Sequence, residues 1–416
     1  MNIFNYQQIE SVPVTIGNLT IGGDSCIVIQ TMCNAPAGDV EAGFLQAKEV
    51  SEAGAQLVRF AVRNVSDAEA LGEIRKKLNQ AGITTPLVAD VHFNPQAAFV
   101  AARLVEKVRI NPGNFIDKRA KFDAKEYSPT EWKAELDRLE ATFLELVDIC
   151  KQHKTALRIG VNHGSLSDRI MSRYGNTPEG MVESAMEFLR LCKKFEFNHA
   201  VVSLKSSNVR VMITAYRMLV EKMIGEGLNF PLHLGVTEAG NELAGRVRSA
   251  VGIGTLLADG IGNTIRVSLT ENPLKELPAA QKLVSYYRNR GFTKNSFLQQ
   301  NYDPFNYHFY PSREVDGIGG TKPPMVVCDA RTVKNIDDAL LSSLGYKKAG
   351  EEWIPTNQAA DAVFVGDATV ETAIPQNLKL VFEASLTKSP IDEAIPLFTK
   401  AEYRHIACRA THVVKW

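Results

Sequence analysis

The stretch ALRIGVNHGSL, residues 156–166, has two faces of opposite character if it forms a β-strand. Successive strand residues point to opposite sides, so residues two apart share a face. The apolar face consists of Leu157, Ile159 and Val161. The other face consists of Arg158, Gly160 and Asn162, and the segment His163-Gly164-Ser165 follows. The pattern predicts a strand that packs on one side and presents a cation, a space and an amide on the other.

Seven other short runs rich in β-branched residues recur in the first 270 residues. They are 26–32, 56–62, 86–92, 107–113, 199–205, 231–237 and 263–269, with helical patterns over 39–54, 66–82, 177–195 and 208–227. Strands that alternate with helices indicate a parallel sheet, and eight such units predict an α/β fold of the TIM (β/α)8 barrel type. A doubly wound open sheet is the alternative, but it needs a GxGxxG motif after the first strand, and QTMCNAPAGD (30–39) is not one.

The last third of the chain has a different pattern. We predict a barrel domain over 1–285, a connector over 286–323 and part of a second α/β domain over 324–416. The second domain has strand-like runs at 324–330, 360–368, 378–384, 403–410 and 411–416, and helices near 332–345 and 390–399. Because this alternation looks unfinished, we expect the chain to be a fragment or a truncated form.

The composition narrows the functional class. Lys+Arg and Asp+Glu both count 47, and a net charge of zero argues against a general nucleic-acid or anionic-membrane surface. The start of the chain lacks a signal-peptide pattern, and no run of apolar residues is long enough to span a membrane. The 6 cysteines are scattered without a CxxC pair, which gives no zinc or thioredoxin motif and fits a reducing, cytoplasmic location.

Alternate residues of a strand share a face, and this rule, applied to every predicted strand, places five cations inside the barrel. They are Arg59, Arg109, Arg158, Lys205 and Arg266. The acids visible there are Asp90 and, just past the seventh strand, Glu238. Unpaired buried charges are costly, so this surplus of cations predicts a bound polyanion. Arginine suits that role because its planar fork binds phosphate oxygens through two hydrogen bonds.

Other candidates lie near the carboxyl ends of the strands, where TIM-barrel sites form. His92 shares a face with Asp90, His163 follows the fifth strand, and His233 is also inward. Helices that begin after strands seven and eight add the usual phosphate site of this fold. Each candidate has a structural alternative: a salt-bridged arginine, a core histidine, or a helix cap for Glu238. We interpret Cys33 as a small apolar filler.

Several motifs together resemble one known family. They are QTMCNAPAGDVEA (30–42), LVADVHF (87–93), VRINPGN (108–114), LRIGVNHGSL (157–166), VVSLKSS (201–207), LGVTEAG (234–240) and GIGTLLADGIGNTIRVSL (252–269). Over about residues 8–280 the chain resembles 4-hydroxy-3-methylbut-2-enyl diphosphate synthase, an oxidoreductase of the methylerythritol phosphate pathway of isoprenoid biosynthesis. Residues 290–416 resemble the start of the extra α/β domain that the long, three-domain form of this family inserts before its C-terminal iron–sulfur domain.

The resemblance implies a reaction and a set of residues. The family opens 2-C-methyl-D-erythritol 2,4-cyclodiphosphate reductively to a linear allylic diphosphate, with electrons from ferredoxin or flavodoxin through a 4Fe-4S cluster, and two-domain relatives act as homodimers. The substrate cradle would comprise Arg59, Arg109, Asn111, Arg158, Asn162, Lys205, Ser207, Arg266 and Ser268, with His163 beside it. The catalytic patch near the carbinol end would comprise Asp90, His92 and Glu238.

One departure from the family limits this prediction. The family holds its cluster with three cysteines, two of them in a CxxC, and one glutamate, all in the C-terminal domain. This sequence has no CxxC, so we expect no metal ligands in this chain and the cluster only in the whole protein. The chain alone would bind the cyclic diphosphate without turnover. Two alternatives stay open: a cluster-free relative that binds the cyclic diphosphate without catalysis, and a TIM-barrel transferase of the pterin-binding type.

Overall fold

The structure, a computed structural model, describes residues 8–116, 127–288, 312–314, 318–366, 368–383, 395–398 and 414–415. The chain divides into two compact units, residues 1–306 and 307–416. Helix α10 (Glu276–Arg288) ends just past position 285, where the barrel domain was predicted to stop. The exact domain boundaries at 285 and 323 stay predictions.

Eight parallel strands form the centre of the first unit. They are β3 (Val28–Met32), β4 (Leu57–Val62), β5 (Leu87–Val91), β6 (Lys107–Ile110), β7 (Ala156–Asn162), β8 (Ala200–Lys205), β9 (His233–Leu234) and β10 (Thr264–Ile265). Their order in the sheet is β8-β7-β6-β5-β4-β3-β10-β9, and a parallel bridge between Val202 and Leu232 joins β8 to the segment before β9. This closure confirms the predicted TIM barrel and rules out the open doubly wound sheet.

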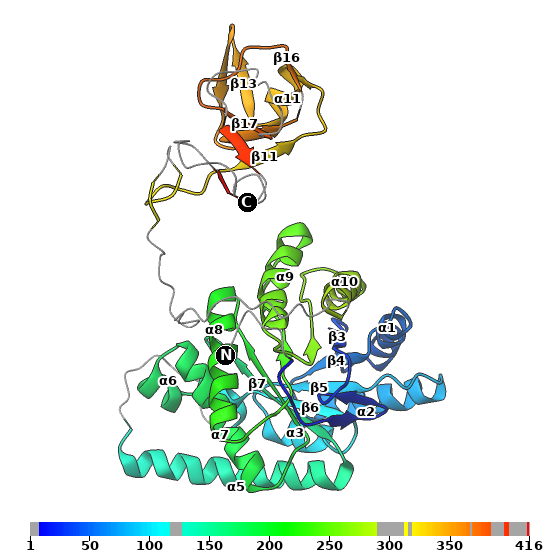
Figure 1. The fold of residues 1–416 in the computed structure, drawn as a ribbon. Coiled ribbons are helices and arrows are strands. Elements are labelled where there is room, and N and C mark those ends of the chain that lie inside the picture. The colour runs from blue at the N-terminus through cyan, green and yellow to red at the C-terminus, as the bar shows by residue number, and fades with distance from the viewer. Residues whose placement is uncertain are drawn as a thin grey trace. The chain divides into compact units, whose positions relative to one another are not determined.

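Helices surround the strands, as Figure 1 shows. They are α1 (Val40–Glu52), α2 (Val65–Gln80), α3 (Pro95–Ala101), α4 (Pro112–Phe115), α5 (Pro129–His153), α6 (Asp168–Tyr174), α7 (Pro178–Lys194), α8 (Val209–Gly225), α9 (Glu242–Ala258), the 3-10 turn η1 (Pro273–Lys275) and α10. Most of their starts follow ordinary capping chemistry, because a side-chain oxygen satisfies a free backbone N–H. Asp39 caps α1, and Ser128 with Glu131 forms a capping box at α5.

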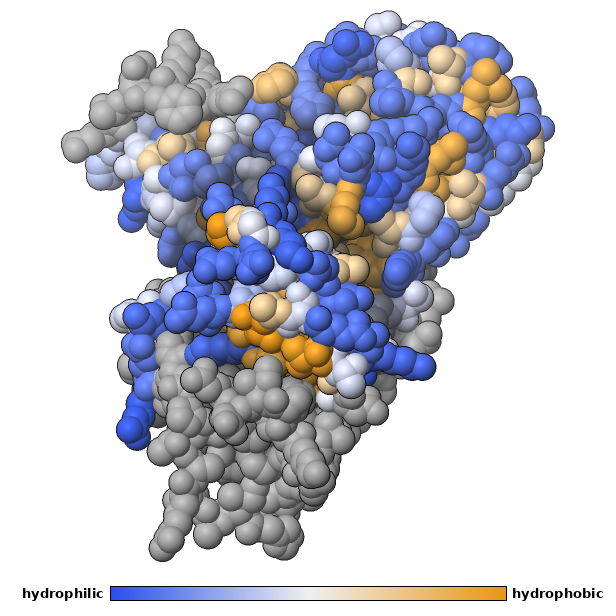
Figure 2. All heavy atoms as spheres, turned by 90° about the horizontal axis from the view of Figure 1, so that it is seen from above, coloured by the Kyte–Doolittle hydropathy of each residue, from blue (hydrophilic) through white to orange (hydrophobic). Residues whose placement is uncertain are grey.

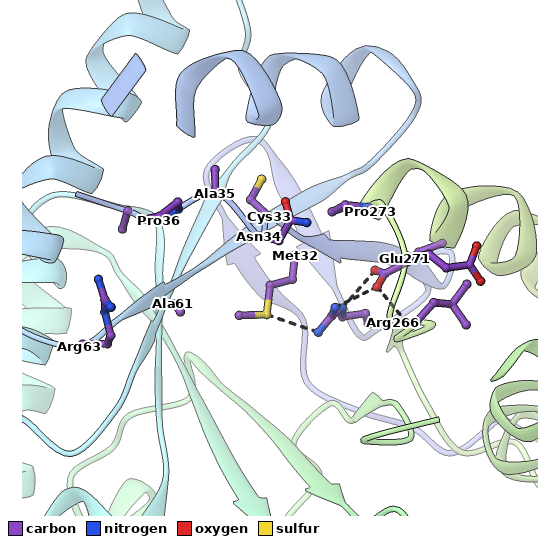
Figure 3. Close-up of a pocket in the computed structure, with 13 residues that line it drawn as sticks. Met32, Cys33, Asn34, Ala35, Pro36, Ala61, Arg63, Arg266, Glu271 and Pro273 are labelled. Carbon is purple, nitrogen blue, oxygen red and sulfur yellow. Dashed lines mark hydrogen bonds and ion pairs between the residues drawn. The ribbon is translucent and has the colours of Figure 1, made fainter. Parts of the chain in front are cut away.

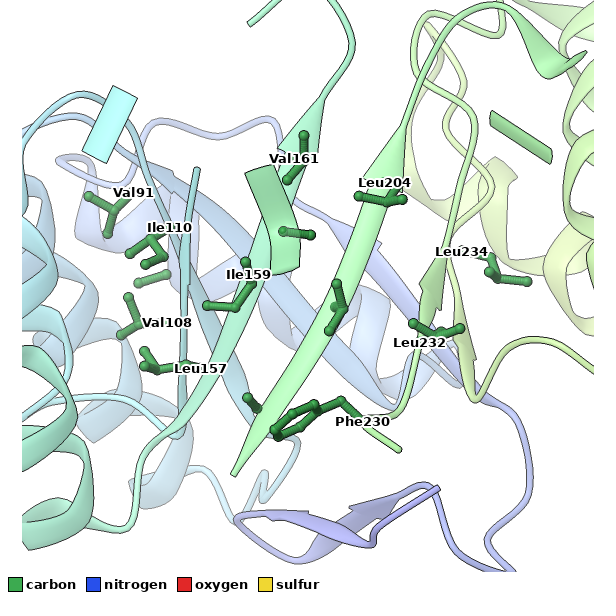
Figure 4. Packing of buried hydrophobic residues seen from close by; sticks show 14 of the residues in the cluster. Val91, Val108, Ile110, Leu157, Ile159, Val161, Leu204, Phe230, Leu232 and Leu234 are labelled. Atoms are coloured by element: carbon green, nitrogen blue, oxygen red, sulfur yellow. The ribbon is translucent and has the colours of Figure 1, made fainter. Parts of the chain in front are cut away.

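The main core lies between the outward faces of the strands and these helices. Figure 4 shows the apolar face of β7, with Leu157, Ile159 and Val161, beside Val108 and Ile110 of β6. All five side chains are fully buried, and burying one such side chain stabilises a fold by roughly 1.5–3 kcal/mol. The apolar half of the predicted strand pattern is therefore used to attach the helices.

A hairpin closes the amino-terminal end of the barrel. Strands β1 (Val14–Ile16) and β2 (Leu19–Ile21) pair antiparallel. Their buried residues Val14, Ile16 and Ile21 pack against the lowest inward residues of the barrel strands. Those residues are Val28, Leu57, Val88, Ala156 and Val201. The polar interior of the barrel thus rests on an apolar floor, which the sequence analysis did not predict.

The second unit contains a parallel sheet in the order β11 (Val327–Ala330), β15 (Ala362–Val365), β17 (Lys379–Glu383), β18 (Ile395–Phe398) and β19 (Val414–Lys415). It also has α11 (Asp338–Ser343) and two strand pairs, β12 (Asn335–Ile336) with β16 (Thr369–Val370) and β13 (Tyr346–Ala349) with β14 (Glu352–Pro355). The predicted helix near 390–399 is wrong, because 395–398 form β18. Pro396 falls inside that segment, where a helix would lose a backbone donor. The predicted strand at 403–410 lies outside the described residues.

Candidate anion-binding site

Asp90, at the carboxyl end of β5, is the centre of a buried charge cluster inside the barrel. Its Oδ1 accepts a hydrogen bond from Arg109 Nη1 at 2.9 Å, and its Oδ2 lies 3.0 Å from Arg59 Nη2. Arg158 Nη2 lies 3.8 Å from Oδ1, and His92 Nε2 lies 3.4 Å from Oδ2. Strands β4, β5, β6 and β7 therefore bring together four of the predicted site residues around one carboxylate.

The cluster holds more positive charge than Asp90 can balance. Burial alone would raise the pKa of Asp90, but the guanidinium groups of Arg109 and Arg59 hold that pKa well below its usual range. Burial, followed by repulsion from Arg59 and Arg109, lowers the pKa of Arg158. Burial likewise lowers the pKa of Arg59 to about 10. Guanidinium groups stay protonated in proteins, so these shifts mark cations that would gain from an added anion.

Gly160 positions the guanidinium group of Arg109, the planar fork of this side chain. Arg109 Nη2 donates a hydrogen bond to the Gly160 carbonyl at 2.7 Å. A Cβ atom at Gly160 would lie 2.4 Å from Arg109 Nε, closer than such atoms approach. Arg158 is fixed on its other side, because Nη1 donates to Ser203 Oγ at 2.7 Å. When the Asn162 amide is turned so that its oxygen faces Arg109 Nη2, the two atoms are 3.2 Å apart.

Arg266 is paired with an acid that the sequence analysis missed. Its Nη2 lies 2.9 Å from Glu276 Oε1, and its Nε donates to Glu276 Oε2 at 3.2 Å. Glu276 also accepts hydrogen bonds from Thr31 Oγ1 and from the Leu269 backbone. Asp90 is therefore joined by a second buried acid, Glu276, which the expected pair of Asp90 and Glu238 did not include. Glu276 begins α10, ten residues after Arg266, where no strand period could place it.

A sixth cation lies deeper in the barrel. Lys107, the first residue of β6, shares the inward face with Arg109 and is fully buried, and its Nζ has no hydrogen-bond partner among the described residues. Burial and the nearby Arg158 hold its pKa well below the usual value for lysine. The same direction applies to the pKa of Lys205 on β8, first by burial and then by Arg59. His233 Nε2 is buried and has no hydrogen-bond partner in the part of the chain that the structure describes, and burial also lowers the pKa of His233.

Other predicted site residues lie at the mouth of the barrel, outside this cluster. Asn111 is buried and caps α4 by accepting from the Gly113 backbone at 3.2 Å. The His163 ring contacts the Asn176 carbonyl at 3.1 Å, so it is held on its own loop. Ser268 is half-buried, whereas Ser207 and Glu238 are exposed. The structure thus leaves the serines and Glu238 at least partly exposed and, among the described residues, joins none of them to Asp90.

A cavity of about 380 Å³ opens at the mouth beside Arg266. Figure 3 shows Met32 and Arg266 pointing toward one another at this cavity, with Cys33, Asn34 and Arg63 on its other walls. Arg59 and Arg266 both contact the Met32 sulfur, at 3.2 and 3.4 Å, so this thioether connects the two cations. Burial raises the pKa of Cys33 to about 12, which agrees with its interpretation as an apolar filler and not a thiolate.

The described residues do not fit an iron–sulfur cluster. Such clusters need several thiolates close together. The five described cysteines are free and contain no CxxC pair: Cys26, Cys33, Cys150, Cys192 and Cys328. Within the described ranges, no group of three or more His, Cys, Asp or Glu side chains could hold a metal ion. In that same part of the chain, no helix is both long and apolar enough to cross a membrane.

Fold and site together define a class of protein, a TIM barrel whose interior carries more buried basic side chains than acidic ones. Residues 11–281 match the family described as GcpE TIM-barrel domain, and the chain belongs to this family. The resemblance inferred from the motifs is confirmed.

Curated relatives are similar over much of the chain. The 4-hydroxy-3-methylbut-2-en-1-yl diphosphate synthase (flavodoxin) of Parabacteroides distasonis is 46% identical over 97% of this chain and 63% of its own length. The chloroplastic, ferredoxin-named synthase of Arabidopsis thaliana is 44% identical over 80% of this chain and 44% of its own length. Among solved structures, a type I 3-dehydroquinate dehydratase from Clostridium difficile has a TM-score of 0.44 and 12% identity, covering 68% of this chain and all of its own. This chain therefore spans less than two thirds of these curated relatives.

Proposed function

We propose that this chain is the substrate barrel of a 4-hydroxy-3-methylbut-2-enyl diphosphate synthase. The observation that carries the proposal is the buried cluster in which Arg59, Arg109 and Arg158 converge on the single carboxylate of Asp90. Together with Lys107, Lys205 and Arg266, six basic side chains line the described barrel interior, against the carboxylates of Asp90 and Glu276. A cyclic diphosphate would supply the missing negative charge, and the family membership supports this substrate class.

The roles of the side chains follow from their positions. The diphosphate oxygens would accept hydrogen bonds from the arginine fork and from Lys205, which makes no ion pair among the described residues. Asn162, Ser268, Ser207 and His163 lie nearer the mouth and would fix the orientation of the ligand. Asn111 would act through the α4 turn that it caps.

Asp90, His92 and Glu238 remain our candidates for the carbinol end of the substrate. His92 is half-exposed and contacts Asp90, so it can move a proton between the site and the mouth. Ring opening takes up two electrons and two protons and releases one water. A 4Fe-4S cluster would supply the electrons in the whole protein, but the described residues do not fit that group. We therefore assign binding and orientation to this chain, and no redox step.

Calorimetry with the cyclic diphosphate tests this proposal. We expect binding that weakens as salt increases, because each phosphate contact is electrostatic. Arg158→Ala should weaken binding at least tenfold, since a buried charged hydrogen bond contributes about 1.5–3 kcal/mol. Arg190→Ala is the matched control, because Arg190 pairs with Glu183 and Glu226 outside the barrel interior. Undetectable binding at low salt, or equal affinity of the two variants, would refute the proposal.

The electron donor and the cluster belong to the same proposal. The relatives are named for flavodoxin and for ferredoxin, and we propose one of these as the donor of the whole protein. The cluster-free binding relative and the pterin-type transferase are disfavoured by the family match, and a cytoplasmic location stays a prediction. Turnover that required no electron donor would favour the transferase.

We also propose a homodimer, supported by one face of helix α9. In Figure 2 the visible described surface is mostly hydrophilic, with apolar residues in separate patches. Leu243, Val247 and Val251 are 73%, 52% and 52% exposed, although an exposed helix face is ordinarily polar. Ala244 and Ala250 are exposed beside them, so the face is symmetric in spacing about Val247. Two antiparallel copies of α9 would match Leu243 with the second copy's Val251, as a twofold interface requires.

A further inference from the structure

Phe93 has an unusual backbone and an unusual environment for a phenylalanine. Its φ angle is 61°, in the left-handed region, where a bulky side chain is a conformational outlier. Its side chain is also 62% exposed, so burial does not compensate for the strained backbone. Strain of this kind persists where the surrounding structure enforces it, and it concentrates at ligand-binding sites.

The neighbours of Phe93 fix this conformation. His92 directly follows β5, and its backbone N–H donates to the Val62 carbonyl at 3.0 Å. Asn94 caps α3, and its side-chain oxygen accepts from the backbones of Gln96 and Ala97 at 3.0 and 3.4 Å. Phe93 is the single residue between a paired strand end and a capped helix start. Phe93 therefore lies in the turn between two residues that are held by hydrogen bonds.

A turn with this backbone does not require a phenyl ring. Glycine adopts the left-handed region without steric cost, and asparagine is tolerated there. The other described non-glycine residues with positive φ are charged. They are Lys154, Glu196, Glu238 and Glu242. A large apolar ring held in this conformation and exposed to water therefore points to a role for the side chain itself.

The ring lies beside the charge cluster. Its centroid is 6.1 Å from that of the His92 ring, and His92 Nε2 is 3.4 Å from Asp90. The edge of the site thus combines an exposed apolar surface with the arginine-rich interior. A ligand that carries both a diphosphate and a branched carbon skeleton would match these two surfaces at once.

We propose that Phe93 forms an apolar rim that packs on the carbon skeleton of the cyclic diphosphate and excludes water from that side of the bound ligand. This inference rests on the proposed function and extends it, because it divides recognition between two surfaces. The arginine cluster binds the phosphates, and Phe93 distinguishes a ligand with an apolar face from a bare inorganic phosphate.

Calorimetry on the full chain with two probes tests this division. The probes are the cyclic diphosphate and inorganic pyrophosphate, which has no carbon skeleton. Phe93→Gly should weaken binding of the cyclic diphosphate about tenfold, while pyrophosphate affinity stays within twofold. Phe93→Leu keeps an apolar side chain and should retain cyclic-diphosphate affinity within threefold. Lys154→Gly is the matched control, because Lys154 has the same backbone region, with φ 56°, at the amino-terminal end of β7.

This experiment distinguishes an effect on fold stability from an effect on ligand affinity. Both glycine variants should raise the urea midpoint of unfolding, because each relieves a left-handed non-glycine residue. Lys154→Gly should leave the affinity for both probes unchanged. Unchanged cyclic-diphosphate affinity in Phe93→Gly would overturn the inference, and so would an equal loss for both probes, which would mean that the ring supports the phosphate cluster. If the unsubstituted chain binds pyrophosphate but not the cyclic diphosphate, the proposed function itself fails.

Discussion

Replacing Asp90 with asparagine is expected to destabilise the ligand-free barrel and to make its stability depend on a bound anion. Asp90 is 2% exposed and faces Arg59, Arg109 and Arg158. Asparagine has nearly the same shape and keeps one acceptor oxygen, but it removes the negative charge. The three guanidinium groups then repel one another in a buried space.

The structure sets the size of this effect. Removing one partner of a buried ion pair costs about 3–5 kcal/mol, because the other charge stays buried and unpaired. The remaining acceptor of asparagine places Asp90→Asn near the lower end, about 3 kcal/mol. A diphosphate at a hundred times its dissociation constant adds about 2.7 kcal/mol to the folded state. Saturating pyrophosphate should therefore return the free energy of unfolding of Asp90→Asn to nearly that of the ligand-free, unsubstituted chain.

Urea unfolding followed by circular dichroism measures both quantities. The pKa of Asp90 is lowered in the folded state, so the stabilisation from its charge is present above the unfolded pKa of about 3.9. It is lost as the pH falls toward the folded pKa. The difference between the unsubstituted chain and Asp90→Asn should be constant from about pH 6 to 8 and should shrink below about pH 4.

The Asp259→Asn variant is the control for this experiment. Asp259 is another buried carboxylate, 2.8 Å from Arg217, and the pair lies outside the barrel interior. Asp259→Asn should also lower the free energy of unfolding. Pyrophosphate should stabilise this variant only as much as it stabilises the unsubstituted chain. The reasoning fails if Asp90→Asn is as stable as the unsubstituted chain. It also fails if the same concentration of pyrophosphate raises the free energy of unfolding of Asp90→Asn no more than that of the unsubstituted chain.

Three further substitutions test other parts of the structure. Gly160→Ala should displace Arg109 and weaken pyrophosphate binding about tenfold by calorimetry, whereas Gly225→Ala, where an added Cβ meets nothing within 4 Å, should leave affinity unchanged. Equal affinities would show that the Gly160 contact does not position the fork. Lys107→Met should raise the free energy of unfolding at pH 7 by about 1–4 kcal/mol, because it removes a buried unpaired cation. The pKa of Lys107 is lowered in the folded state, so the unfolded chain binds the extra proton and the gain should shrink as pH rises toward about 10. A loss of stability at pH 7 would contradict this interpretation. Val247→Glu should convert the dimer to a monomer in sedimentation equilibrium at unchanged fold stability, and identical masses for both proteins would exclude the α9 interface.

The alternation of apolar and polar residues along the parallel strands predicted most of the barrel and its inward cations. It works because each buried strand has one face against helices, so the polar exceptions mark the interior. It did not include Lys107, which begins β6 on the same face as Arg109, because a lysine at the first position of a strand is ordinarily exposed. The hairpin over 14–21 was missed because its strands are only three residues long.

Pairing between distant elements could not be predicted in the same way. Glu276 meets Arg266 because η1 and the start of α10 turn back over β10, and no local pattern records that turn. The strained turn at Phe93 also has no sequence signature, since the usual signal for positive φ is glycine or asparagine. The second unit shows the limit of propensity, because IPLF at 395–398 forms a strand within a segment predicted as a helix.

The apolar floor made by the β1–β2 hairpin has a kinetic consequence. Among the described residues, its apolar side chains close the amino-terminal end of the barrel, so a ligand of the proposed kind would reach the buried cations from the carboxyl-terminal end. An incoming dianion and the solvent or counter-ions that it displaces must pass through the same opening in opposite directions. Exchange of one bound anion for another would therefore be sequential, because the first occupant leaves before or as the next one enters. Anything that covers the mouth then sets the residence time of whatever is inside.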